Sequence, residues 1–148
     1  FLPFFASTIL EEGPNLRAFL DWAWSLDDPV FYHWHHYEKI HLEKMGEFYQ
    51  IDPRRLEWVL ERMVDLVPPV TDSFAFPCYG RGLKDIAKSL GFSWRQDDVD
   101  GAGSVVLFRQ FVESGGDAIG IKNKILTYNE DDCFATMYVF DWLMAQED

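Results

Sequence analysis

The apolar positions in the first third of the chain predict a strand, a helix and a second strand. Residues 1–6 are almost all apolar and predict a strand, which Pro3 would confine to the edge of a sheet. Apolar residues at helical spacing predict an amphipathic helix over residues 14–26, with Pro14 in its first turn. Residues 29–34 are β-branched and aromatic, which is typical of a buried strand.

From residue 36 onwards the pattern is mostly helical. A second helix is predicted over residues 36–48, and Asp52-Pro53 supplies an N-cap and a first-turn proline for a third helix. The apolar side of that third helix is expected to hold Leu56, Val59, Leu60 and Met63. Residues 65–70 contain Pro68-Pro69, which predicts an extended segment or a turn.

The second half of the chain is predicted to contain three helices, over residues 82–90, 102–114 and 118–145. Gly91 ends the first of them, and residues 93–101 are predicted to form an acidic loop. Gly115-Gly116 separates the other two, and Asp117 is suited to cap the last helix.

This order of elements predicts an α/β fold with a helix-rich C-terminal part. A chain of 148 residues with 48% hydrophobic and 17% aromatic residues is expected to form one domain over residues 1–148 with a packed core. Two strands are too few for a stable sheet beside so many helices. We therefore expect the rest of the sheet to precede Phe1 or to come from a partner, and the absence of an initial Met favours the former.

Charge and cysteine content limit the classes of function. A net charge of −12 argues against a passive DNA-binding module, which needs a basic face. It argues less against a nuclease, because divalent ions supply positive charge locally. Cys78 and Cys133 form neither a disulfide framework nor a zinc motif, which favours a cytoplasmic location. No apolar run reaches the length of a membrane span.

The first candidate site is the stretch from Tyr128 to Asp132, within the last predicted helix. A separation of four residues places Tyr128 and Asp132 on one helical face. A carboxylate there can hold a divalent metal, and a phenol one turn earlier can position a water. The alternative is that Glu130, Asp131 and Asp132 form a solvated acidic face.

The second candidate site is the run from His33 to Lys39, where a predicted strand gives way to a helix. Catalytic groups often gather at the carboxyl ends of strands in α/β sheets. Glu38 is a candidate metal-binding carboxylate, and a zinc site of His35, Glu38 and His41 is a weaker alternative. Glu38 is equally consistent with a first-turn residue favoured by the helix dipole.

Four motifs follow one another in order, from Val30 to Lys39, from Asp65 to Val67, from Gly82 to Phe92, and from Tyr128 to Cys133. This ordered set is similar to the predicted RecB-family nucleases, whose domain is ribonuclease H-like and related to the DEDD exonucleases. The resemblance extends over nearly the whole chain.

This resemblance implies a ribonuclease H-like fold, with a mixed sheet flanked by helices, and a site with two Mg²⁺ or Mn²⁺ ions. Asp132 would be the third-motif metal ligand and Tyr128 the residue of the tyrosine subtype that orients water. Glu38 would take the second-motif metal position, where the family usually has Asp. The first motif, Asp-x-Glu on the first strand, is absent, so the first strands of the fold are expected to be missing and residues 1–6 to be the third.

The resemblance implies a 3′–5′ exonuclease acting by a two-metal mechanism on DNA or RNA, with a single-stranded end as the substrate. Helicase or nuclease domains are expected as fused or associated partners. The alternative is a catalytically degenerate module that binds nucleic acid or a partner protein in a larger machine. Because two of four acidic ligands are missing, we expect this chain alone to bind metal weakly and to cleave little.

Overall fold

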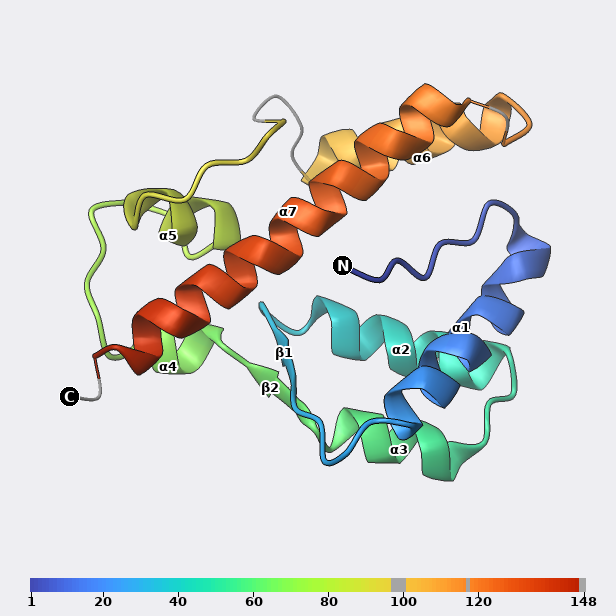
Figure 1. The fold of residues 1–148 in the computed structure, drawn as a ribbon, viewed down its shortest axis with the longest axis horizontal. Helices are drawn as coiled ribbons and strands as arrows, with labels where there is room; N and C mark the ends of the chain where they lie inside the picture. The colour runs from blue at the N-terminus through green and yellow to red at the C-terminus, as the bar shows by residue number, and fades with distance from the viewer. Residues whose placement is uncertain (97–100, 117, 147–148) are drawn as a thin grey trace. The chain divides into compact units, whose positions relative to one another are not determined.

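The computed structural model describes residues 1–96, 101–116 and 118–146. The fold is α/β with helices dominating (Figure 1). The chain divides into two compact units, one of residues 4–74 and one of residues 1–3 with 75–148. The assignment of residues 1–148 to one domain stays a prediction.

The unit of residues 4–74 contains a two-stranded parallel sheet and four helices. Its elements are α1 (Ile9–Trp24), β1 (Phe31–His33), α2 (Tyr37–Phe48), α3 (Pro53–Leu60), β2 (Met63–Asp65) and α4 (Val67–Thr71). In the register of the sheet, His33 pairs with Asp65. Parallel strands need a crossover connection, which α2 and α3 provide. The carboxyl ends of both strands therefore lie side by side.

The core of this unit forms between α1, α3 and the segment after α2. Leu16, Leu20 and Ala23 line one face of α1 and meet Ile51 and Val59. Aromatic and long aliphatic side chains surround this cluster: Phe19, Trp22, Phe31, Leu42, Met45, Tyr49, Leu56 and Trp58. Burying each leucine stabilises the unit by about 2 kcal/mol.

The unit containing residues 75–148 is built around a long helix. Its helices are α5 (Leu83–Ser89), α6 (Gly101–Glu113) and α7 (Ile119–Met144). Figure 1 shows α6 beside the amino-terminal part of α7, and α5 further along the same helix. The buried residues Ile86 and Phe111 come from the shorter helices, and Ala135 and Val139 come from α7.

Most of the predicted helices are present with small changes at their ends. The helix predicted over 36–48 is α2, and the helices predicted over 82–90, 102–114 and 118–145 are α5, α6 and α7. Asp52 caps α3 as predicted, because its carboxylate accepts a hydrogen bond from the Arg54 amide at 3.0 Å. The second predicted strand is present as β1. Asp117 and residues 97–100 of the predicted acidic loop lie outside the described residues.

The strand predicted over residues 1–6 is wrong, and so is its assignment as the third strand of the sheet. These residues have no regular secondary structure. Phe4 instead packs edge-on against Phe19, with ring centroids 5.4 Å apart, and against Trp22. Pro3 lacks the amide hydrogen of a ladder residue, and aromatic packing of Phe4 replaces strand pairing.

The first helix begins at Ile9 rather than at Pro14, which lies inside it. Thr8 is the N-cap, and its carbonyl accepts from the Glu11 amide at 3.0 Å. The Glu11 carboxylate accepts in turn from the Ser7 amide at 2.7 Å. This arrangement resembles a capping box, and the Thr-x-x-Glu spacing in the sequence is the signal that marks the true start.

Residues 61–71 also differ from the prediction. Met63, predicted on the third helix, lies in β2, and Pro68-Pro69, predicted in an extended segment or a turn, lies in the first turn of the short helix α4. Proline suits a first helical turn, whose amides have no partner inside the helix. The described residues do not form the larger mixed sheet that was expected. Their sheet consists of β1 and β2.

Candidate functional site

Tyr128 and Asp132 lie one turn apart on α7 and are both partly buried. The Asp132 carboxylate accepts a hydrogen bond from the indole Nε1 of Trp94, with 2.8 Å between Nε1 and Oδ1. Trp94 is only 6% exposed, so its indole is fixed by packing. A buried donor of this kind fixes the orientation of the carboxylate, as outer-shell partners do for metal ligands.

Asp131 and Glu130 hold Arg95 and do not form a solvated face. Asp131 is 3% exposed, and its two oxygens accept from the amide and from Nε of Arg95 at 2.8 and 2.7 Å. Glu130 accepts from Nη2 of Arg95 at 2.5 Å. These carboxylates raise the pKa of Arg95, Glu130 having the larger effect. Neither Asp131 nor Glu130 therefore belongs to a solvated acidic face. Together with Asp132, these carboxylates anchor the segment that follows α5.

The turn after α5 delivers Trp94 and Arg95 to α7. Gly91 has φ +101°, and its amide donates to the Lys88 carbonyl at 3.0 Å. The Phe92 amide donates to the Ala87 carbonyl at 2.9 Å, which completes a Schellman motif. Glycine is needed here because other residues rarely adopt this backbone conformation. The predicted stop at Gly91 thus reverses the chain toward α7.

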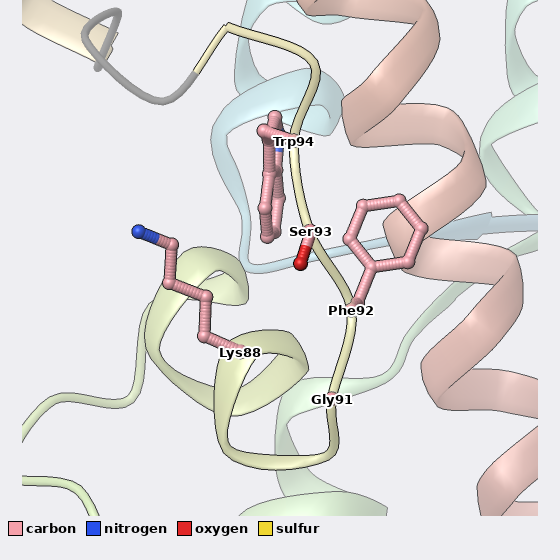
Figure 2. A pocket seen from close by; sticks show the side chains of 5 residues that line it. All are labelled: Lys88, Gly91, Phe92, Ser93 and Trp94. Carbon is pink, nitrogen blue, oxygen red and sulfur yellow. The ribbon is translucent and has the colours of Figure 1, made fainter.

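A pocket of about 310 Å³ lies beside this turn. It is lined by Lys88, Gly91, Phe92, Ser93 and Trp94. Figure 2 shows the side chains of Lys88 and Ser93 on one side of the loop and Phe92 on the other side, toward α7. Sequence reasoning missed Trp94, Arg95 and Lys88 as site residues, because the basic residues of this segment are spaced apart and form no run.

Glu38 lies in the other unit, in the first turn of α2 and near the carboxyl end of β1. Its Oε2 is 3.8 Å from Nδ1 of the buried His33, and its side chain is half-exposed. Partial burial raises the pKa of Glu38, and the charge of Asp65 raises this pKa further, while its own backbone amide and His33 oppose the shift. Carboxylates with a shifted pKa are common at functional sites.

Asp65 orders the ends of both strands. Its Oδ1 accepts from the amides of His35 and Val67, each at 2.9 Å. His35 has φ +68°, and the Asp65 hydrogen bond holds this unusual backbone in place. The Nδ1 of His33 donates to the His35 carbonyl at 2.5 Å. The ends of the two strands therefore place Glu38, His33 and Asp65 near one another.

The zinc alternative is not supported. The described parts of the chain contain no group of three or more His, Cys, Asp or Glu side chains that could hold a metal ion. His41 Nδ1 donates to the Tyr37 carbonyl at 2.9 Å, and its ring stacks on Tyr37. The ring of His35 lies against that of His36, with centroids 4.1 Å apart.

The same finding limits a site for two hard cations. Carboxylate oxygens such as those of Asp132 and Glu38 are the ligands that Mg²⁺ and Mn²⁺ prefer. These two residues belong to different units, and Asp131 is committed to Arg95. Within the described residues, neither unit by itself gathers the ligands that a two-metal centre requires.

Cys78 and Cys133 are not joined in a disulfide bond. None of the helices in the described ranges, α7 included, has the length and apolar character needed to cross a bilayer. The cytoplasmic location stays a prediction.

A comparison with protein families supports the expected superfamily. A family model described as RNase H superfamily matches residues 1–144. No curated protein and no solved structure matches the chain. The α/β structure with a small parallel sheet is compatible with a ribonuclease H-like fold. Membership of this superfamily suggests a nuclease-like function on nucleic acid. The match covers nearly the whole chain, which therefore belongs to the RNase H superfamily.

Proposed function

We propose that this chain is part of a metal-dependent 3′–5′ exonuclease that hydrolyses phosphodiester bonds at a single-stranded end of DNA or RNA. The observation that supports this most directly is the Asp132 carboxylate, which Trp94 orients one turn after Tyr128 on α7. The proposal places the chain near the RecB-family nucleases and the tyrosine subtype of the DEDD exonucleases, to which its motifs are similar.

Each proposed residue has a defined role. Asp132 and Glu38 are each proposed as a metal-ligating carboxylate, one in each unit, and each needs further ligands. Mg²⁺ or Mn²⁺, when bound, would offset the negative charge that develops on the phosphate. Tyr128 orients the attacking water with its phenol, and Trp94 keeps the Asp132 carboxylate in one orientation through its indole N–H. The raised pKa of Glu38 distinguishes it from an ordinary surface glutamate and supports its choice as a metal ligand.

The test uses the natural protein that contains these residues and a single-stranded oligonucleotide labelled at its 5′ end. With Mn²⁺, we expect products that shorten progressively and retain the label. Asp132→Asn should lower the rate about a hundredfold or more, because even outer-shell partners of metal ligands are worth about ten- to a hundredfold. The amide oxygen still accepts from Trp94, so thermal stability should change little.

Glu130→Gln is the matched control, since it removes a carboxylate on the same helix whose partner is Arg95. It should retain most of the activity. Equal losses in both variants, or an Asp132→Asn protein that still cleaves at the wild-type rate, would contradict the metal-ligand role. Products that lose the 5′ label first would contradict the polarity.

The second candidate is a catalytically degenerate module that binds nucleic acid or a partner protein. It is favoured by the use of Glu130 and Asp131 as partners of Arg95, and by the lack of a three-ligand group within the described residues. The same assay separates the two functions. Binding of the oligonucleotide without cleavage, under every divalent ion tried, would support the degenerate module.

A further inference from the structure

Four rings that follow β1 lie on the surface of the unit of residues 4–74. They belong to His35, His36, Tyr37 and His41, and all four residues are exposed. With the buried His33, these imidazoles are all the histidines of the chain. Exposed rings add little to a folded core, so their concentration at one strand end indicates that they contact something outside the unit.

The backbone at this strand end holds an unusual conformation. His35 has φ +68°, and its amide donates to the Asp65 carboxylate at 2.9 Å. The ring of His35 lies against that of His36, with centroids 4.1 Å apart. Such conformations persist where the surrounding structure holds them, and they are frequent at functional sites. The strand end is therefore fixed in a form that keeps these rings at the surface.

Tyr37 and His41 form a stacked pair one turn apart on α2. Their ring centroids are 3.9 Å apart, and the rings are inclined by 26°. His41 covers one face of the phenol ring, and Tyr37 is nevertheless 63% exposed, which leaves the opposite face open to solvent. A ring that is supported on one face and open on the other is suited to stack on a flat ligand.

This stacked pair lies beside a carboxylate of the proposed function. Tyr37 directly precedes Glu38, and His41 follows Glu38 by three residues, which places these two side chains on the same side of α2. The flat group of a nucleic acid is its base, and single strands offer base faces that a duplex keeps stacked inside. Stacking needs no positive charge on the protein, so it is compatible with a net charge of −12.

We propose that Tyr37, supported by His41, stacks on the terminal base of a single-stranded substrate and holds it beside Glu38. The inference rests on the proposed function, because it assigns a base contact to the same substrate. Every base has a π face, so this contact accepts any terminal base and selects an unpaired end over a paired one.

The test measures binding of fluorescent single-stranded oligonucleotides to the natural protein in EDTA, which prevents cleavage. One probe is complete, and the other lacks the base of its 3′-terminal nucleotide. Wild type should bind the complete strand about tenfold more tightly, within the range for one stacked base. Tyr37→Ala should bind both strands with the lower affinity. Because no ionic contact is lost, the slope of log K against log salt should not change.

Two further variants are the controls. Tyr37→Phe keeps the ring and should bind both probes as wild type does. Phe48→Ala removes another exposed aromatic side chain, at the other end of α2, and should change neither affinity. A wild-type protein that does not distinguish the probes, Tyr37→Ala that binds as wild type does, or equal losses in Tyr37→Ala and Phe48→Ala would each overturn the inference.

Failure of this inference is distinguishable from failure of the proposed function. If Asp132→Asn abolishes cleavage by the natural protein while Tyr37→Ala still distinguishes the two probes, the nuclease stands and the stacking site does not. If Tyr37→Ala loses this distinction while Asp132→Asn cleaves normally, the stacking site stands and the role of Asp132 does not.

Discussion

Asp131 and Asp132 are adjacent in sequence and contact different groups. On a helix, neighbouring residues point about 100° apart. Asp131 falls on the buried stripe with Ala135 and Val139, where it needs Arg95 as a partner. Asp132 lies beside this stripe and meets the Trp94 indole. Loss of activity on mutating Asp131 would therefore report lost anchoring of residue 95 and is no evidence for a metal ligand.

Glu38 makes the stability of its unit depend on pH. Its pKa is raised in the folded state, so ionisation of Glu38 opposes folding as pH rises above about 4.5. In metal-free buffer, Glu38→Gln should therefore be more stable than wild type at pH 7, and this advantage should disappear near pH 4. Denaturant unfolding at several pH values measures the difference.

Glu43→Gln, an exposed residue on the same helix, is the control for this measurement. A Glu38→Gln protein that is less stable than wild type at pH 7 would contradict the expected sign. If Glu38 is a functional carboxylate, Glu38→Gln should be more stable and less active as a nuclease than wild type. Functional residues are often retained at a cost to folding stability.

At the scale of elements, the turn after α5 depends on a single glycine. Among the described residues, a Cβ at Gly91 would meet only the Tyr138 hydroxyl at 3.7 Å, so the obstacle to substitution is the backbone and not space. Gly91→Ala should lower the free energy of unfolding by about 1–2 kcal/mol through its positive φ.

Gly120→Ala is a useful contrast in the first turn of α7. No atom of the described residues lies within 4 Å of a Cβ at Gly120, and its substitution should raise helix stability by about 0.5–1 kcal/mol. Thermal unfolding of both variants tests whether their stabilities change in these opposite directions. Similar melting temperatures for Gly91→Ala and wild type would show that the left-handed turn is not required.

The elements that the sequence predicted well are those with local causes. The N-cap at Asp52, the stop at Gly91 and the shared face of Tyr128 and Asp132 each depend on spacing within a few residues. The three-residue strand β2 is too short to show a period of its own and depends on pairing with β1. Arg95 and Asp131 pair across 36 residues, so no local pattern indicates that Asp131 is buried.

At the scale of the molecule, the distribution of carboxylates limits metal binding. The described residues of the chain show no three-ligand group, although the chain carries 25 acidic residues. We therefore expect weak binding of Mn²⁺ by the 148-residue chain and little digestion of single-stranded DNA. Calorimetric titration with Mn²⁺ should give a dissociation constant on the order of millimolar, in the range of weak sites built from few charged ligands.

Asp132→Asn should reduce the heat of this titration, and Glu130→Gln should not. Tight binding of Mn²⁺ with vigorous digestion by the chain alone would contradict this expectation.

The hydrogen bond from Trp94 to Asp132 also makes the indole a reporter of events at this carboxylate. An indole N–H gives a separate proton–nitrogen resonance in the NMR spectrum, and its position depends on the charge of the acceptor. Assignment of that resonance requires only a Trp94→Phe spectrum. A shift of this one signal on addition of Mn²⁺ or an oligonucleotide would locate the event at Asp132 even in a protein that shows no turnover.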